Sequence, residues 1–499
     1  MDFFVCLSGA IEIIDLAETG EDVVTTHGPR MFTGELDLFN DRKILVDGRV
    51  TDGTTICRVA RADFARMMSA EPDIAEIVMR AFILRRTAFL VHDQAGVTLA
   101  GPANGGDTLR ITRFLGRNGY PLQRVDTDDT EQADAFFAKH PQARSALPVV
   151  IHGDGTCLSN PNNHEVAVAL GLTEDFDPDH IYDVAVVGAG PAGLAAATYA
   201  ASEGLDTAVI EQEAPGGQAG TSSKIENYLG FPTGISGQAL AGRAWIQAQK
   251  FGARFAVSRA ITALDCDERP YTLRMECGER VRARVIVVAS GARYRTLDVD
   301  DYEKYEGQGI HYAATAIEAR LCINKDIIVV GGGNSAGQAA MFLSRHAKHV
   351  HMLVRGPSLA ATMSDYLVQR LEASPRITIH AQTQITGLHG DPLLEQVSWT
   401  NAAAGEESTH QIANIFVMIG AVPNSDWLED CLETDGKGFV MTGGKDENGD
   451  VAAPYATSKP GIYAVGDVRS GSVKRVASGV GEGSVVIASV HQYLASLDD

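Results

Sequence analysis

The chain has 499 residues, which at roughly 150 residues per domain predicts about three domains. Hydrophobic residues make up 45% of the sequence and charged residues 21%, which excludes a mainly disordered or fibrous chain. Lys and Arg number 42 against 64 Asp and Glu, giving a formal net charge of −22. A field of this sign repels polyanions, so we expect no binding to nucleic acid or to an anionic membrane.

The N-terminal sequence lacks the basic start and cleavage site of a secretory signal, and no apolar run reaches about 18 residues. We therefore expect a cytoplasmic protein. The odd cysteine count and the absence of any C-x-x-C pair argue against a disulfide framework and a zinc site. We expect reduced, mostly buried thiols and no metal site. The cysteines are Cys6, Cys57, Cys157, Cys266, Cys277, Cys322 and Cys431.

Residues 1–92 begin with short alternating strands in FFVCLSGAIEIIDL, DVVTTHGP and TTICRVA, followed by apolar residues at helical spacing that Pro72 interrupts. This β-barrel-plus-helices pattern, with FTGELDLF in its middle, resembles a truncated cyclic-nucleotide-binding domain. In that family the residue matching Glu35 holds the ribose and an Arg followed by Ser or Thr holds the phosphate. Ile44 and Leu45 stand at those last two positions here, so a degenerate domain with a structural or docking role is favoured over ligand binding.

Residues 93–175 read β-α-β-α-β-β-α, with the first strand expected in FLVHDQ. The pattern resembles a glutaredoxin or thioredoxin fold and places Pro148 at that family's cis-proline. The stretch GPANGGDT, where a redox cysteine would begin the first helix, contains no sulfur. Cys157, in the later β-hairpin, is better explained as an idle thiol than as a redox group.

From residue 183 the sequence shows a buried strand, a glycine-rich turn, a helix and a second strand ending in Glu211. Gly188, Gly190 and Gly193 form G-x-G-x-x-G, which permits the tight turn, the approach of a pyrophosphate and close packing of helix on strand. Glu211 is placed to accept hydrogen bonds from a ribose. This unit predicts a dinucleotide site.

A second unit starts at KDIIVVGGGNSAGQ, with Gly331, Gly333 and Ala336 in the motif. Its second strand ends in Arg355 instead of an acid, which favours NADPH over NADH because Arg attracts a 2′-phosphate. Two dinucleotide units in one chain are typical of a flavin enzyme that takes hydride from a nicotinamide cofactor.

Residues 183 to about 495 resemble the two-domain, low-molecular-weight thioredoxin reductases. The motifs are GGQAGTSSKIENYLGFP, VIVVASGARYR, IGAVPN and GIYAVGDVRSGSVKRVASGVGEGS, in the family's order. The resemblance implies an α/β fold with two Rossmann-like domains, the FAD domain being 183–300 joined to 410–499 and the NAD(P)H domain 301–409. It also implies a homodimer.

The two glycine-rich turns and the family resemblance together give the residues that we expect to bind the cofactors. Those for FAD are Gly188, Gly190, Pro191, Ala192, Gly193, Glu211, Gly217, Gln218, Asn227, Ala289, Ser290, Gly291, Gly466, Asp467, Arg475, Val476 and Ala477. Those for NADPH are Gly331, Gly333, Asn334, Ser335, Ala336, Arg355 and Gly420.

The chain departs from thioredoxin reductases where they carry a C-A-T-C pair, because Ala313 and Ala316 replace the two cysteines. Alanine cannot attack a disulfide, so a dithiol relay at this place is excluded. Cys322, six residues further on, is better explained as a structural thiol than as a substitute. The family's sequence signature for binding the 2′-phosphate is also incomplete in this chain. We therefore expect Arg355 to bind that phosphate, assisted by His351 or Ser358.

These features predict hydride transfer from NADPH to FAD and then direct reduction of an acceptor. The acceptor could be a ferredoxin or flavodoxin, a quinone, an external disulfide or dioxygen. We expect Lys474 and Arg475 to stabilise the anionic reduced ring, or else to be surface groups. A small redox protein could dock on the front domains. The alternatives are a flavin-based sensor with little turnover and a redox-inactive scaffold, which two intact phosphate turns disfavour.

Overall fold

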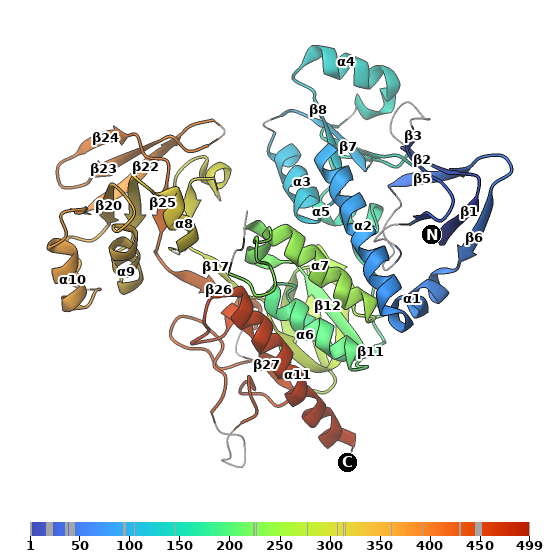
Figure 1. Cartoon of the computed structure of the whole chain (residues 1–499). Helices are drawn as coiled ribbons and strands as arrows, with labels where there is room; N and C mark the ends of the chain where they lie inside the picture. Colours follow the sequence, from blue (N-terminus) through green and yellow to red (C-terminus); the bar gives the residue numbers. More distant parts are fainter. Residues whose placement is uncertain are drawn as a thin grey trace. The chain divides into compact units, whose positions relative to one another are not determined.

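The structure is a computed structural model of the whole chain. It describes all residues except 1, 16–22, 35–37, 39–44, 93–95, 104, 145, 223, 224, 226, 277, 307, 313, 315, 361, 392, 429, 430, 445–451 and 499. The chain forms two compact units (Figure 1). The first comprises Met1–Thr221, Ile235–Gly291 and Ser425–Asp499, and the second comprises Ser222–Gly234 and Ala292–Asn424.

The first unit begins with two small antiparallel sheets and two helices. One sheet has the order β4-β1-β6 and the other β3-β2-β5. The elements are β1 (Phe3–Ser8), β2 (Ile11–Asp15), β3 (Val23–His27), β4 (Phe32–Thr33), β5 (Val46–Val50), β6 (Thr55–Val59), α1 (Arg61–Ala70) and α2 (Pro72–His92). The predicted helix break at Pro72 is confirmed. Of the positions discussed for a cyclic nucleotide, Glu35 and Ile44 lie outside the described residues, and Leu45 is buried in the core.

A four-stranded sheet of order β10-β9-β7-β8 follows, and we call residues 97–172 the second domain. Its elements are β7 (Val97–Gly101), α3 (Gly106–Arg117), β8 (Leu122–Asp126), α4 (Thr130–Lys139), η2 (Pro141–Arg144), β9 (Val149–His152), β10 (Cys157–Ser159) and α5 (Asn163–Ala169). The predicted element order and the cis peptide at Pro148 are confirmed. The predicted first strand at FLVHDQ was wrong, because α2 continues to His92 and β7 starts at Val97. An apolar run of this length fits either a strand or a buried helix end.

The largest sheet belongs to the first unit and has the order β13-β12-β11-β16-β15-β14, with β27 beside β16. Its strands are β11 (Ile181–Val187), β12 (Thr207–Glu211), β13 (Arg254–Val257), β14 (Ile261–Asp265), β15 (Tyr271–Met275), β16 (Arg280–Val288) and β27 (Ile462–Ala464). The other elements are α6 (Pro191–Ser202), η3 (Gly217–Thr221), α7 (Gly237–Lys250), η5 (Asp426–Leu428), η6 (Gly466–Val468) and α11 (Val476–Asp498). The parallel strands β11 and β12 and the second half of β16, residues 285–288, are almost continuously apolar, as strands covered on both faces require.

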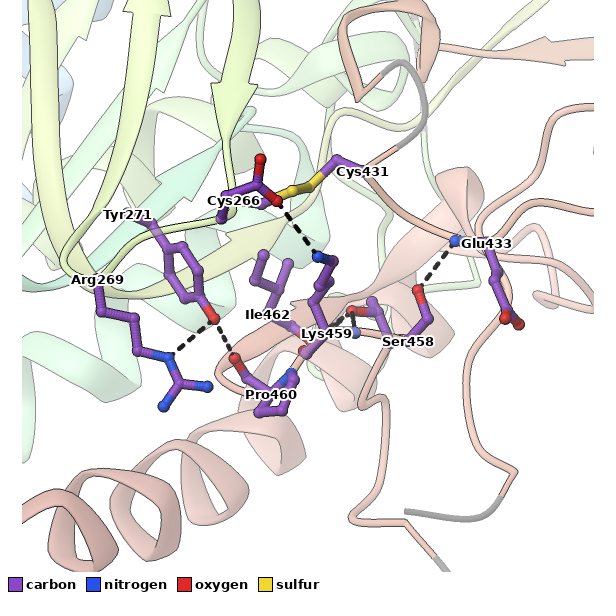
Figure 2. Close-up of a disulfide and its surroundings, with 11 residues drawn as sticks. Cys266, Arg269, Tyr271, Cys431, Glu433, Ser458, Lys459, Pro460 and Ile462 are labelled. Carbon is purple, nitrogen blue, oxygen red and sulfur yellow. Dashed lines mark hydrogen bonds and ion pairs between the residues drawn. A yellow bond between two sulfur atoms is a disulfide. The ribbon is translucent and has the colours of Figure 1, made fainter. Parts of the chain in front are cut away.

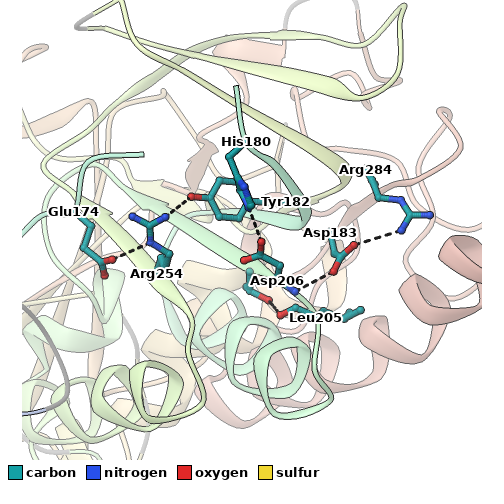
Figure 3. A network of polar contacts seen from close by, with 9 residues as sticks. Glu174, His180, Tyr182, Asp183, Leu205, Asp206, Arg254 and Arg284 are labelled. Atoms are coloured by element: carbon teal, nitrogen blue, oxygen red, sulfur yellow. Dashed lines mark hydrogen bonds and ion pairs between the residues drawn. The ribbon is translucent and has the colours of Figure 1, made fainter. Parts of the chain in front are cut away.

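The chain enters this sheet through residues 173–180, which polar contacts hold against it (Figure 3). Arg254 on β13 bonds Glu174 at 3.1 Å and donates to the Tyr182 hydroxyl at 2.9 Å. His180 lies 2.6 Å from Asp206, the residue before β12. The segment between the second domain and the large sheet is therefore anchored on the sheet.

The second unit has a parallel sheet of order β18-β25-β19-β20-β21. Its elements are β17 (Ala292–Tyr294), η4 (Tyr302–Tyr305), β18 (Ile310–His311), α8 (Ala316–Leu321), β19 (Asp326–Val330), α9 (Asn334–Leu343), β20 (His349–Val354), α10 (Asp365–Glu372), β21 (Ile377–Ala381), β22 (Thr383–His389), β23 (Gln396–Asn401), β24 (Glu406–His410), β25 (Ile415–Val417) and β26 (Ala421–Pro423). The antiparallel β22–β24 sheet packs on it through a shared apolar cluster. The nicotinamide-domain limits that we expect, 301–409, lie inside this unit.

Two cysteines 165 residues apart form a disulfide, so the expectation that all thiols are reduced was wrong (Figure 2). Cys266 follows β14, Cys431 follows η5, and their Cα atoms are 6.2 Å apart. An open cavity of about 640 Å³ adjoins this bond and is lined in part by Trp427, Arg282 and Lys459. The described free cysteines are Cys6, Cys57, Cys157 and Cys322.

Candidate functional site

The first glycine-rich turn lies between β11 and α6 and has the sterics that a dinucleotide requires. Gly188 has φ of +100°, and a Cβ on Gly193 would lie 1.9 Å from the Gly188 carbonyl oxygen. A Cβ on Gly190 would meet nothing within 4 Å. Gly190 is the N-cap of α6, makes no side-chain cap bond and precedes Pro191. No side chain therefore caps this helix end, and the space beside Gly190 is open, as the approach of a pyrophosphate requires.

Glu211 ends β12 with its carboxylate held against the same turn. One oxygen accepts the N–H of Ala189 at 2.7 Å and the other accepts those of Glu213 at 2.9 Å and Ala214 at 3.3 Å. Burial raises the pKa of Glu211, and the bonds from Glu213 and Ala189 oppose that rise. The carboxylate is thus oriented, and its remaining lone-pair capacity fits a ribose hydroxyl.

The loop after β12 folds back onto the turn. Gly216, with φ of +110°, donates its N–H to the Ala189 carbonyl at 2.7 Å. A Cβ on Gly217 would lie 3.1 Å from the Gly190 Cα. Gln218 is exposed beside them; Asn227, also exposed, belongs to the second unit.

A third part of the site comes from the C-terminal segment. Gly466 has φ of +75° and donates its N–H to the buried Glu482 carboxylate at 2.7 Å. Arg469 pairs with the same carboxylate at 2.8 Å. Between them Asp467 is half-buried and accepts a bond from Ser472 at 3.3 Å, while burial raises the pKa of Asp467.

Helices α6 and α11 pack at close range and bring these parts together (Figure 1). A Cβ on Gly483 would lie 2.1 Å from the Ala192 carbonyl oxygen, and one on Gly466 would lie 2.9 Å from the Ala192 Cβ. Ala289 donates to the Val187 carbonyl at 2.8 Å and lies against Gly188, with Ser290 and Gly291 following. α11 begins at Val476, and Ala477 is exposed in its first turn.

The second glycine-rich turn repeats the arrangement in the second unit. Gly331 has φ of +139°, and a Cβ there would lie 2.5 Å from the Met418 carbonyl oxygen. Gly333 is the N-cap of α9 and faces open space, whereas Ala336 is fully buried. Each compact unit therefore carries a helix N-terminus open to a phosphate.

Comparisons with known proteins agree with this geometry. Residues 182–483 match the family model described as pyridine nucleotide-disulphide oxidoreductase. The chain belongs to this family. It is 30% identical to the thioredoxin reductase of Bacillus subtilis over 64% of this chain and 97% of that protein, and 33% identical to that of Mycolicibacterium smegmatis over 64% and 98%. A thioredoxin reductase structure from Streptococcus pyogenes matches with a TM-score of 0.57 and 30% identity, over 63% of this chain and 99% of that one.

The match makes the chain a thioredoxin reductase-like pyridine nucleotide-disulphide oxidoreductase, a flavin-dependent NAD(P)H enzyme, and confirms the predicted Rossmann-like α/β fold. Its thioredoxin reductase relatives use FAD and NADPH. The first 181 residues lie outside the matched range.

In this pyridine nucleotide-disulphide oxidoreductase, some of the residues expected to bind NADPH are exposed, and some already form hydrogen bonds to neighbouring residues. Arg355 is exposed just after β20, and Ser335 and Ser358 are exposed as well. The Asn334 side-chain oxygen already accepts the Ser364 N–H at 2.9 Å. His351 is engaged elsewhere, because its Nδ1 lies 3.0 Å from His380 Nε2.

Gly420 has φ of +92°, and its carbonyl accepts the Arg295 N–H at 3.1 Å. In the first unit, Lys474 lies with its ammonium 5.4 Å from the Phe439 ring centre, and its charge opposes the raised pKa of Asp467. Arg475 is exposed.

The positions of the family's cysteine pair are only partly described. Ala313 lies outside the described residues, and Ala316 begins α8. Burial raises the pKa of Cys322 to about 12, and its Sγ lies 3.3 Å from the Glu318 carbonyl oxygen. A thiol held protonated is a poor nucleophile, which supports a structural role for Cys322.

Sequence reasoning missed the residues that brace the site. Glu482 and Arg469 fix the Gly466 turn, and Arg117 of the second domain reaches the loop after Glu211. A glutamate between glycines in an otherwise apolar helix was the one available signal for Glu482. Among the described residues, no group of three or more His, Cys, Asp or Glu side chains could hold a metal ion. No helix in the described part of the chain is long and apolar enough to cross a membrane.

Proposed function

We propose that the chain is an NADPH-dependent FAD oxidoreductase that reduces an external acceptor directly, without an internal dithiol relay. One observation carries the proposal: the chain combines two glycine-rich turns, each opening a helix N-terminus to a phosphate, with alanine at both relay positions. The turns serve the cofactors, whereas alanine supplies no sulfur for disulfide exchange.

The residues of the first unit fit FAD. The α6 N-terminus at Gly190 would bind the pyrophosphate, Glu211 a ribose and Asp467 the ribityl chain. The N-terminus of α11 at Val476 would favour negative charge on the ring. When bound, FAD would supply the redox chemistry by taking two electrons from reduced nicotinamide and giving them to the acceptor.

The residues of the second unit fit a nicotinamide dinucleotide. The α9 N-terminus at Gly333 would bind its pyrophosphate, and Arg355 would bind the 2′-phosphate of NADPH. With His351 bound to His380, Arg355 would act with Ser358. NADPH is therefore favoured, and NADH is the weaker alternative.

The acceptor class stays open between a ferredoxin or flavodoxin, a quinone, an external disulfide and dioxygen. Burial of Cys322 argues against a replacement relay. The Cys266–Cys431 disulfide is the other internal group that could take electrons, and the test must separate it from the flavin.

The first test is anaerobic mixing of the purified protein with NADPH, and separately with NADH, followed by bleaching of the oxidised flavin band. Bleaching complete in well under a second supports a working hydride path and names the preferred nicotinamide. Slow or absent bleaching despite bound FAD would contradict the proposed enzyme activity and would favour a sensor.

A reductive titration tests the direct transfer. We expect two electrons per FAD, both in the wild type and in Cys266→Ser. Four electrons in the wild type but two in Cys266→Ser would show that the disulfide acts as a relay and would overturn the proposal. Steady-state turnover with each acceptor class then identifies the oxidant.

The sensor is kept as a second candidate because the second domain contacts the loop that follows Glu211. A change at a bound flavin could reach the front of the chain through that contact. Such a protein would bind FAD tightly and turn over slowly with every acceptor.

The homodimer implied by the family resemblance is also proposed. Helix α2 supports self-association, because Ile74, Ile77 and Leu84 are exposed at spacings of three and seven residues. Light scattering of the purified protein gives the mass directly, and a monomer would contradict the proposal.

A further inference from the structure

Among the described residues, the second domain contacts the expected FAD site through the C-terminal end of α3. Arg117 forms an ion pair with Glu213 and donates a second hydrogen bond to the Gly217 carbonyl at 3.2 Å. Next to it, Asn118 donates its side-chain amide to the Glu213 carbonyl at 3.2 Å. Arg117, the last residue of α3, and its C-cap Asn118 thus hold both ends of the segment 213–217.

The end of α3 is a firm support for these contacts. Phe114 and Leu115 are buried in the second domain's core. The chain then turns tightly, with the Gly119 N–H bonded to the Gly116 carbonyl at 3.1 Å and the Tyr120 N–H to the Leu115 carbonyl at 3.0 Å. A cation in the last turn also suits the helix dipole. Arg117 therefore projects from a fixed position.

The segment that Arg117 holds is the one that shapes the FAD site. The Glu213 N–H bonds the Glu211 carboxylate at 2.9 Å, so a shift of Glu213 moves the group expected to bind the ribose. At the other end, Gly217 lies against Gly190, the N-cap of α6. The positive charge of Arg117 also opposes the rise that burial causes in the pKa of Glu211.

Other contacts anchor the second domain independently of Arg117. Arg259, which is 4% exposed, bonds His164 at the start of α5 and pairs with Glu279 at 3.2 Å. Gln238 of α7 donates to the Gly116 carbonyl. Removing Arg117 should therefore leave the second domain attached.

We propose that Arg117 is a positioning residue for FAD: the second domain acts as a built-in clamp that holds the loop from Glu211 to Thr221 in the shape that accepts the dinucleotide. This inference rests on the proposed function, because it requires FAD at that loop. It gives the second domain, which lacks a redox cysteine at its first helix, a role in the flavin site.

The test is the affinity of full-length apoprotein for FAD, followed by quenching of flavin fluorescence. We expect Arg117→Ala to raise the Kd about fivefold, the size expected from one charged hydrogen bond and one partly exposed ion pair. Arg117→Glu should raise the Kd further, and Glu213→Arg added to Arg117→Glu should recover only the part due to the ion pair, because a glutamate cannot donate to the Gly217 carbonyl. The matched control is Arg110→Ala, on the same helix, whose guanidinium bonds Asp107, Asn163 and Pro161 of its own domain.

Hydrogen exchange of the apoprotein gives a readout that needs no cofactor. Backbone amides of residues 211–221 should exchange faster in Arg117→Ala than in the wild type or Arg110→Ala, with the melting temperature unchanged. A Kd unchanged in both Arg117→Ala and Arg117→Glu overturns the clamp, as does an equal loss in Arg110→Ala. Failure of the wild type to bind FAD would instead contradict the proposed function.

Discussion

The Glu482 carboxylate accepts the Gly466 N–H at 2.7 Å and links the interior of α11 to the turn that carries Asp467. Its second oxygen pairs with Arg469 at 2.8 Å, and the two side chains are 9% and 18% exposed. Removing one partner of such a pair leaves a buried charge without compensation. We predict that Glu482→Ala lowers the free energy of unfolding by about 3 kcal/mol.

Urea unfolding of the apoprotein measures this change. Glu482→Gln should lower the free energy of unfolding by less than Glu482→Ala does, because the glutamine amide oxygen can still accept the Gly466 N–H. The control is Glu203→Gln in the pair with His491, whose side chains are 46% and 40% exposed, where we expect a loss below about 0.5 kcal/mol. Equal stability of Glu482→Ala and this control would contradict a bracing role for Glu482.

The Cys266–Cys431 disulfide joins the β14–β15 hairpin to the segment after η5 (Figure 2). Closing a loop of 165 residues stabilises a protein by up to about 5 kcal/mol in the chain-entropy model. We predict that dithiothreitol, which can enter the adjoining cavity, lowers the melting temperature and exposes two additional thiols. Cys266→Ser should lower the melting temperature in oxidising buffer and remove its response to dithiothreitol. An unreduced wild type with seven titratable thiols would contradict the bond.

The features predicted correctly from the sequence are those whose cause is local. Gly193 is required by its contact with Gly188 inside one strand-turn-helix unit, and Gly188 by its own φ of +100° in that turn, so a short motif reveals them. The helix break at Pro72 is local in the same sense.

The features that escaped prediction depend on residues far apart in the chain. Cys266 meets Cys431 only because β14 and η5 pack together, and no spacing rule marks such a pair. Arg117 and Glu213 are 96 residues apart in the sequence, and nothing in the sequence around either residue distinguishes it from an ordinary charged surface residue. The strand expected at FLVHDQ failed for another reason, because an apolar run at a domain boundary fits both helix and strand.

Histidines pack between β20, β21 and the β22–β24 sheet of the second unit. His351 lies 3.0 Å from His380 and contacts Trp399, which stacks on His410 with ring centres 3.7 Å apart. Burial, together with the charges of neighbouring histidines, lowers the pKa of His351 to about 4; burial also lowers the pKa values of His380 and His410. In the unfolded chain these groups titrate near 6.5, so the unfolded state binds more protons below that pH.

The unfolding free energy should therefore be highest above pH 6.5, and should fall as the pH drops from 6.5 towards 4. Asp326 is the nearby acid that opposes the shift of His351. Thermal melts at several pH values measure the effect, and His351→Gln should flatten the curve in that window. His27, whose pKa burial also lowers to about 4, will retain a part of the dependence in this variant. A curve of unchanged slope in His351→Gln would contradict the assignment.

Arg355 stands exposed at the end of β20, the position where an acid would select NADH. A charge-assisted bond to the 2′-phosphate should be lost in Arg355→Ala, and the KM for NADPH should rise about tenfold while that for NADH stays within about twofold. Arg355→Glu should reverse the preference, because a carboxylate repels the phosphate and accepts bonds from the 2′-hydroxyl. Flavin reduction rates measured against the concentration of each nicotinamide give both constants. Arg345→Ala, on the same unit after α9, is the charge-matched control. Equal rises in KM for both nicotinamides in Arg355→Ala would show that Arg355 does not recognise the 2′-phosphate.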